Sequence, residues 1–250
     1  MNLNRGSDAS LRHPEESGLI LVMKERLANL IKNGYRRLPC PGFTRFRNLR
    51  IFDWMNAQAP GKVVLNLGSG SGAFDHYLSP EIKTIKLDIK PCPQVEVIAD
   101  AHWLPFATSS IDIVYSIAVL EHVKKPWKVA EEIHRVLRPG GYVVVELPFL
   151  NVIHDEHDYF RFTDKGIKSL FDERRFEPIL EQVGSGGGSF LPVFLWSYFQ
   201  QFIPTRPLKA LWRSAARFLF SPLKYLDLLI DKSPDLRLTA NSFSFIGRKR

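Results

Sequence analysis

The stretch "NLGSGSGAF", residues 66–74, constrains the fold more than any other part of this 250-residue chain. Three glycines stand at alternate positions directly after "KVVLNLG", an apolar run typical of a buried strand. Glycine turns sharply and lets a bound group approach the backbone, because it has no side chain. The stretch predicts a strand, a tight turn and a helix over about 72–78. A turn that merely permits close packing is the alternative.

The segments after this loop alternate between strand-like and helix-like patterns. Such an alternation predicts an α/β fold with a parallel, doubly wound sheet and helices on both faces. Ligands of such sheets bind at the carboxyl ends of the strands. The expected strands are 84–89, 95–100, 111–117 and 142–148, and the expected helix is 126–137, followed by a turn at "RPGG".

Charge is distributed unevenly along the chain. Residues 24–50 hold eight Lys/Arg and one acid, and residues 205–250 hold ten Lys/Arg and three acids. These basic flanks favour an anionic partner. The first residues lack the apolar centre of a signal peptide, no run is long enough to span a membrane, and the two cysteines form no C-x-x-C pair. We therefore expect a cytoplasmic protein.

Asp88 lies twenty residues after Gly68, at the end of the second expected strand. A carboxylate at this place can accept hydrogen bonds from both hydroxyls of a ribose. The glycine loop and Asp88 together predict an adenosine-containing cofactor. Because the loop fits both G-x-G-x-G and G-x-G-x-x-G/A, these residues leave open which cofactor it is.

Three later segments narrow the choice: "ADAHWLPF" (99–106), "SSIDIVYSIAVLEHV" (109–123) and "VLRPGGYVVVELP" (136–148). With them the chain resembles the class I S-adenosylmethionine-dependent methyltransferases of the type-11 group, from about Lys62 to Glu181. The resemblance implies S-adenosylmethionine as cofactor and a Rossmann-like seven-stranded sheet with one antiparallel strand. In such a sheet, 175–184 and 241–249 form the closing antiparallel pair.

The resemblance also implies roles for individual residues around the cofactor. Asn66 stands where the family usually has an acid, which weakens the expected contact to the cofactor's amino group. Backbone contacts come from the glycine loop, ribose and adenine contacts from the next two strand ends, and a cap on the sulfonium from the segment after the fourth strand. The residues are Gly68, Ser69, Gly70 and Gly72; Leu87, Asp88 and Ile89; Asp100 and Ala101; and Ser116, Ile117, Glu121 and His122.

The segment "PFLNVIHDEHDYFRFT" (148–163) follows the fifth expected strand, where this fold places substrate residues. By its similarity to type-11 relatives, His154 is the candidate base, and Asp158, Tyr159 and Arg161 face the acceptor. A metal site built on His154 and His157 is disfavoured, because no further His or Cys cluster supports it. We expect no metal. A loop merely held by Tyr159 and an Arg–Asp pair is the structural alternative.

The acceptor is expected to be a small molecule, a glycan or a lipid-linked compound. An amino-directed nucleobase enzyme would carry an Asn/Asp-Pro-Pro-aromatic element where this chain has Ser116-Ile117-Ala118-Val119. Nucleic acid is therefore an unlikely partner. An RNA-directed methyltransferase and a scaffold that binds the cofactor without turnover remain the alternatives.

About 55 residues separate the two expected closing strands, which is far beyond a hairpin turn. They begin with a flexible "GSGGGS" and reach a helix-like stretch in which Lys209, Arg213 and Arg217 oppose an apolar face. Such a face favours attachment to an anionic membrane, and a lid or a dimer contact is the alternative. The expected parts are a helical basic extension (1–60, with a helix at 19–33), a cofactor-binding core (61–184), an apolar and basic helical insertion (185–240) and a final strand (241–250). The apolar residues are Leu208, Leu211, Trp212, Ala215, Phe218 and Leu219, and the basic extension adds Arg36, Arg37, Arg45, Arg47 and Arg50.

Overall fold

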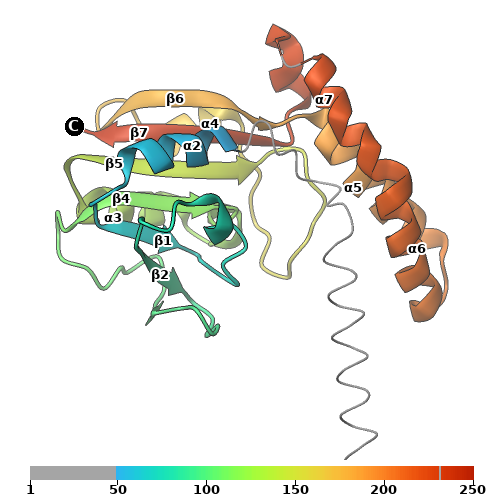
Figure 1. Cartoon of the computed structure of the whole chain (residues 1–250), viewed down its shortest axis with the longest axis horizontal. Helices are drawn as coiled ribbons and strands as arrows, with labels where there is room; N and C mark the ends of the chain where they lie inside the picture. Colours follow the sequence, from blue (N-terminus) through green and yellow to red (C-terminus); the bar gives the residue numbers. More distant parts are fainter. Residues whose placement is uncertain (1–48, 231) are drawn as a thin grey trace, which may run out of the picture. The chain divides into compact units, whose positions relative to one another are not determined.

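The computed structural model describes residues 49–230 and 232–250. Its seven strands form one sheet in the order β3-β2-β1-β4-β5-β7-β6 (Figure 1). β7 runs antiparallel to both neighbours and the other pairs are parallel, which confirms the predicted fold class. The helix expected at 19–33 and four of the five basic residues of the N-terminal extension lie outside the described residues. The strands are β1 (Val64–Leu67), β2 (Thr84–Asp88), β3 (Val97–Ile98), β4 (Ile111–Ile117), β5 (Leu137–Pro148), β6 (Phe176–Ser185) and β7 (Ser242–Lys249).

Both faces of the sheet are covered, because its central strands are apolar on both sides. On one face, α3 (Pro126–Val136) and α4 (Asp164–Leu170) pack against side chains such as Leu65 and Val145. On the other face, α2 (Leu49–Gln58) packs against Val64, Tyr115 and Val144. Because β1, β2 and β4 are parallel, the loops that follow them meet at one edge of the sheet.

The helix expected at 72–78 is wrong. Only a single 3₁₀ turn, η1 (Asp75–Tyr77), forms between β1 and β2. Gly72 has a φ of 67°, a left-handed conformation that cannot continue into a helix. The ring of Phe52 on α2 lies 5.2 Å from that of Tyr77, so α2 packs directly against this turn.

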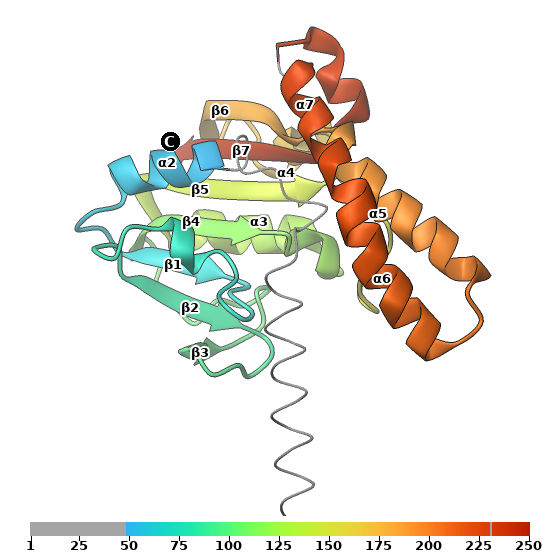
Figure 2. The ribbon, with the colours of Figure 1, turned by 45° about the vertical axis from the view of Figure 1, so that its right-hand side comes forward.

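A helical segment separates β6 from β7, as Figures 1 and 2 show. In both views α5 and α6 lie side by side beyond the end of the sheet toward which β5 points. The indole Nε1 of Trp212 donates a hydrogen bond of 3.1 Å to the carbonyl of Trp196 and so joins α6 to α5. The segment consists of α5 (Gly187–Phe199), η3 (Gln200–Phe202), α6 (Arg206–Phe220), η4 (Ser221–Tyr225), α7 (Leu226–Leu229) and η5 (Pro234–Thr239).

The run "GSGGGS" was expected to be a flexible linker, and this is wrong. Its first two residues end β6, and its last three form the first turn of α5. The buried carboxylate of Asp227 accepts hydrogen bonds from the amides of Gly186, Gly188 and Ser189 at 2.7–3.2 Å. It also accepts one from the Ser189 hydroxyl at 3.0 Å. A Cβ on Gly186 would lie 2.5 Å from this carboxylate, so the glycines allow the close approach. Asp227 thus caps α5 from 38 residues or more away in sequence.

Candidate functional site

The glycine loop is fixed to β2 by its own amides. The amides of Gly68 and Ser69 both donate to the carbonyl of Leu87, at 2.8 and 3.0 Å. The next free amide, that of Gly70, donates to Asp88 Oδ2 at 2.8 Å. A Cβ on Gly70 would have only Asp88 Oδ2 within 4 Å, so this glycine borders open space.

A cavity of about 560 Å³ lies over this loop. Its volume is in the range of sites that hold a nucleoside-sized ligand. Eight of the residues predicted around the cofactor line it, and they come from the ends of β1, β2, β3 and the segment after β4. They are Gly68, Gly70, Leu87, Asp88, Ile89, Asp100, Ala101 and His122.

Two carboxylates in this cavity are held in place by hydrogen bonds. Asp88 accepts from the amides of Gly70 and Lys90, one on each oxygen, which leaves further lone pairs for hydroxyl groups. Asp100 accepts from the amide and from the ring Nδ1 of His102, at 2.9 and 2.6 Å. Burial raises the pKa of Asp100, but the His102 hydrogen bonds outweigh it and leave the pKa below its usual value. Both side chains are therefore oriented acceptors.

Other predicted cofactor residues lie elsewhere. Asn66 places its amide 3.4 Å from Asp75 Oδ1, outside the lining of the cavity. Ser69, Gly72 and Ser116 are also absent from the lining, and the hydroxyls of the two serines have no hydrogen-bond partner among the described residues. Ile117 and Glu121 line a second, smaller cavity instead.

This second cavity has a volume of about 140 Å³ and shares one residue, Ala118, with the first. Ala118 has a φ of 54°, unusual for a residue with a side chain, and its amide donates to the carbonyl of Glu146 at 2.9 Å. Backbone strain of this kind is common at functional sites. The sequence analysis did not select Ala118, because an alanine shows no sign of its backbone conformation. The smaller cavity is lined by Phe52, Phe74, Ile117, Ala118, Glu121, Glu146, Leu147, Pro148, Asn151, His154, Ser185, Asn241 and Ser242.

One wall of the smaller cavity is a buried polar network that the sequence analysis also missed. Ser242 Oγ donates to Glu146 Oε1 at 2.8 Å, and Ser185 Oγ lies 2.9 Å from Ser242 Oγ. Asn241 Nδ2 donates to Ser185 Oγ at 2.9 Å. The lone acid in the apolar run "YVVVELP" was the available signal, because an acid in a buried strand needs partners.

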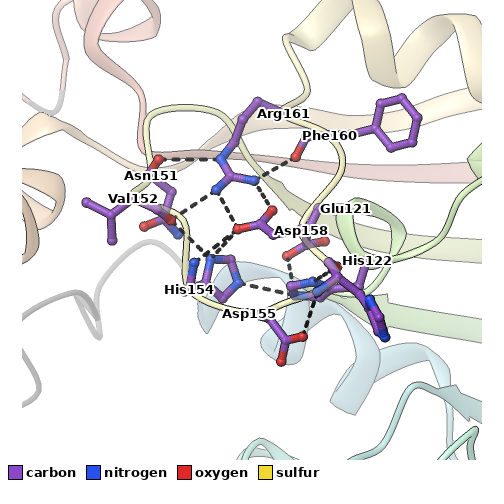
Figure 3. Close-up of polar contacts among 10 residues, drawn as sticks. Glu121, His122, Asn151, Val152, His154, Asp155, Asp158, Phe160 and Arg161 are labelled. Atoms are coloured by element: carbon purple, nitrogen blue, oxygen red, sulfur yellow. Dashed lines mark hydrogen bonds and ion pairs between the residues drawn. The ribbon is translucent and has the colours of Figure 1, made fainter.

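The loop after β5 is braced by Asp158 and Arg161 (Figure 3). Their side chains form a bidentate ion pair, in which Arg161 Nη2 lies 2.8 Å from Asp158 Oδ2. Arg161 also donates to the carbonyls of Val152 and Phe160, at 3.0 and 2.7 Å. The hydrogen bond from Arg161 lowers the pKa of Asp158 to about 2, so this carboxyl stays ionised. Neither residue lines either of the two cavities. This matches the structural alternative from the sequence analysis, in which an Arg–Asp pair holds the loop in place.

The other residues predicted in this loop divide between the two cavities. His154 lines the smaller cavity, whereas Tyr159 lines the larger one, together with Asp155 and His157. The amide of Tyr159 donates to the carbonyl of Glu121 at 2.8 Å, which ties the loop to the segment after β4. The loop therefore contributes to both cavities at their junction.

Glu121, His122 and His154 meet at this junction (Figure 3). The Nε2 atoms of the two histidines lie 3.2 Å apart, and Glu121 Oε1 lies 3.6 Å from His122 Nε2. Glu121 is fully buried, and neither of its carboxylate oxygens has a hydrogen-bond partner among the described residues. Burial, with a smaller contribution from the nearby charge of Asp158, raises the pKa of Glu121 to about 8.

Comparisons with known proteins bear on the family and the fold of the chain. Residues 65–145 match the family model described as "Methyltransferase domain". An uncharacterized methyltransferase from Mycobacterium sp. (strain KMS) is 36% identical over 96 residues, which are 34% of this chain and 38% of that protein. The match thus spans well under two thirds of that relative's length.

Two solved structures have the same fold. A putative sarcosine dimethylglycine methyltransferase from Galdieria sulphuraria has a TM-score of 0.53 at 16% identity, covering 84% of this chain and 92% of the other. The "Phospholethanolamine N-methyltransferase 2" of Haemonchus contortus, solved with phosphomonomethylethanolamine and S-adenosylhomocysteine, has a TM-score of 0.51 at 18% identity. It covers 83% of this chain and 54% of the other. At these identities the structures show the fold alone.

Proposed function

We propose that the chain is a class I S-adenosylmethionine-dependent methyltransferase of the type-11 group and that it methylates a small-molecule, glycan or lipid-linked acceptor held in the smaller cavity. The observation that carries the proposal is that two cavities meet at Ala118. The larger is lined by eight of the fourteen residues expected around S-adenosylmethionine, and the smaller has polar groups that could bind an acceptor.

The residues of the larger cavity fit this cofactor. Asp88 is fixed by two amides with lone pairs to spare for ribose hydroxyls. Asp100 keeps one oxygen without a His102 contact, and this oxygen would accept from the adenine amino group. Gly70 borders open space, where the cofactor needs close approach to the backbone.

When bound, the cofactor supplies an electrophilic methyl carbon, to which a lone pair of the acceptor bonds while the carbon–sulfur bond breaks and its electron pair stays on sulfur. The chain's own contribution is to orient the acceptor and to exclude water. Glu146, Asn241 and Ser242 would bind polar groups of the acceptor, because their side chains already share one network on the cavity wall. His154 would take or orient the proton that an acceptor hydroxyl loses.

Binding and turnover test this proposal separately. Asp88→Ala should weaken S-adenosylmethionine binding in calorimetry, and His154→Ala should lower turnover far more than cofactor affinity, with His157→Ala as its control. Incubation with methyl-labelled cofactor and fractionated extract would show whether label enters lipid, glycan, RNA or small molecules. Unchanged cofactor affinity in a folded Asp88→Ala variant contradicts the assignment of the larger cavity, and label in RNA contradicts the proposed acceptor class.

We also propose that the α5–α6 hairpin attaches the protein to an anionic membrane surface. Leu211, Phe218 and Leu219 on α6 are 69%, 60% and 65% exposed. The sequence of α6 contains four basic residues and no acid, which favours a negatively charged surface. No helix among residues 49–230 and 232–250 is long and apolar enough to cross a membrane. The sequence analysis placed Trp212 on the exposed apolar face of α6, and this is wrong. The Trp212 indole donates a hydrogen bond to α5, and its ring lies 6.1 Å from that of Phe199.

Co-sedimentation with lipid vesicles tests this attachment. The protein should sediment with anionic vesicles and not with neutral ones, and salt should weaken the binding because it screens charge. Replacing both Leu211 and Phe218 with serine should abolish binding to anionic vesicles. Serine at Ile98, 63% exposed on β3, is the matched control. Equal binding to both kinds of vesicle, or no effect of the double substitution, leaves the hairpin as a lid or dimer contact.

A further inference from the structure

The ring hydrogens of His122 and His154 can be placed from their partners. His122 Nδ1 lies 2.7 Å from the carbonyl oxygen of His157. A carbonyl only accepts, so Nδ1 carries the hydrogen, and Nε2 of the neutral ring holds a lone pair. His154 Nδ1 lies 3.1 Å from Asp158 Oδ2 and 3.2 Å from the carbonyl of Val152, so the same argument leaves its Nε2 with a lone pair.

Three electron-pair donors therefore face one another at the junction of the cavities. The two Nε2 atoms are 3.2 Å apart, and the Glu121 carboxylate lies 3.6 Å from one of them. No hydrogen stands between the rings in their neutral forms. The Glu121 oxygens are buried without a hydrogen-bond partner in the part of the chain that the structure describes. Such an arrangement is unfavourable unless a proton or a metal ion lies between the groups.

We propose that Glu121, His122 and His154 bind a divalent transition-metal ion of the zinc or iron(II) kind. Two imidazole nitrogens and one carboxylate oxygen are a ligand set that such ions prefer. Metal–nitrogen bonds of about 2.0–2.1 Å place two nitrogens about 2.9 Å apart at a right angle and about 3.4 Å apart in a tetrahedron. The observed 3.2 Å lies between these values.

The groups behind these ligands are those that metal-binding histidines have elsewhere. A ligating histidine usually donates its other ring hydrogen to a carbonyl or a carboxylate, which fixes the ring. His122 donates to a carbonyl, and His154 contacts Asp158, which Arg161 holds in turn (Figure 3). The sequence analysis considered His154 with His157. The ring of His157 instead stacks on Tyr159, and only its carbonyl supports the site.

The place of this metal site suggests its role, which rests on the proposed function. Glu121 and His154 line the smaller cavity and His122 lines the larger one. Three protein ligands leave positions open, and a hydroxyl of the acceptor would occupy one of them. With His154 Nε2 bound to the ion, this role replaces the proton transfer assigned to His154 above. The ion would lower the pKa of that hydroxyl, and its proton would pass to water. The oxygen then forms the bond to the methyl carbon as the carbon–sulfur bond breaks toward sulfur.

Metal binding is measurable without cofactor or acceptor. The full-length protein, stripped by a chelator, should bind one equivalent of Zn²⁺ in calorimetry. It should also bind one Co²⁺ ion, with visible absorption bands of a nitrogen- and oxygen-ligated ion. Glu121→Gln and His154→Ala should each lower metal affinity at least tenfold. His154 does not line the larger cavity, so S-adenosylmethionine affinity should stay unchanged in His154→Ala.

His157→Ala is the matched control, because it removes an imidazole from the same loop and keeps the carbonyl that holds His122. It should bind the metal like the unchanged protein. The proposal is overturned if the unchanged protein binds neither ion at micromolar concentration, as expected if the two rings merely share a proton. It is also overturned if His157→Ala loses as much affinity as His154→Ala. Metal binding without methyl transfer would leave this site standing and contradict the proposed function alone.

Discussion

Alanine variants of three glycines with similar positive φ would distinguish the cost of backbone strain from the loss of cofactor binding. Gly61, Gly68 and Gly70 have φ values of 73°, 76° and 50°. Alanine costs about 1–2 kcal/mol in this left-handed region, and the reduced freedom of the unfolded chain offsets about 0.4–1 kcal/mol of that. The three alanine variants therefore share a loss of roughly 1 kcal/mol in unfolding free energy.

The surroundings of these glycines make the variants differ. A Cβ on Gly61 meets no atom within 4 Å, so Gly61→Ala shows the strain alone. A Cβ on Gly68 would lie 2.3 Å from Val119 Cγ2, and this overpacking adds about 1–3 kcal/mol. A Cβ on Gly70 meets only Asp88 Oδ2, at 4.0 Å, and enters the space assigned to the cofactor. Gly70→Ala should thus be as stable as Gly61→Ala without cofactor and bind it at least tenfold more weakly.

Urea unfolding with and without S-adenosylmethionine measures both effects. At a cofactor concentration of about 100 times the dissociation constant, binding stabilises a protein by about 2.7 kcal/mol. A tenfold weaker affinity at the same concentration reduces this gain to about 1.4 kcal/mol. Gly61→Ala should keep the full gain and Gly70→Ala about half of it. The assignment of the larger cavity is refuted if Gly70→Ala gains as much stability as Gly61→Ala.

Three further predictions concern contacts outside the lining of the two cavities. Asp227→Ala removes a carboxylate that accepts from three buried amides and a hydroxyl, and it should lower the unfolding free energy by about 2–5 kcal/mol in urea. Asp235→Ala, at an exposed acid of the same segment, should change it little. Arg135→Ala frees the carbonyls of Leu104 and Phe106 beside the adenine-side loop and should lower cofactor affinity in calorimetry, by a few-fold. Hydrogen bonds from Arg135 lower the pKa of Glu132, so the stability that Glu132 contributes is present above pH 4.5 and is lost as the pH falls through its folded-state pKa. Acid titration of the unfolding free energy should show this loss in the unchanged protein and not in Glu132→Gln.

The sequence predicted the sheet well because its strands carry their own signals. The run 111–117 is apolar and β-branched, and β4 has these same bounds. The closing strands at 175–184 and 241–249 were found within one residue. Such runs form strands wherever both faces are buried, so local composition decides them. The helix at 72–78 failed because Gly72 takes a left-handed conformation, and only a short turn forms where the segment packs against α2. The residue types of this segment do not show that conformation.

The candidate site was predictable only in part, for a related reason. Gly70, Asp88 and Asp100 follow strand ends, and parallel strands bring such ends together in any sheet of this kind. The approach of His154 to His122 joins positions 32 residues apart through a loop whose path Asp158 and Arg161 fix. The cap of α5 by Asp227 spans a similar distance. Contacts of this kind depend on the folded path of the chain, which residue types alone do not specify.

The helical segment and the acceptor cavity share the same strand ends, which bears on how an acceptor reaches the site. Ser185 ends β6 and lines the smaller cavity, and the carbonyl of Ser185 accepts from the amide of Asn241, just before β7. One residue further, Gly186 begins the contacts with Asp227 that start α5. The hairpin that we propose to attach to a membrane is thereby tied, through two buried residues, to the wall of the cavity. Under the proposed attachment, a lipid-linked acceptor bound at the hairpin would meet the cavity without leaving the membrane surface.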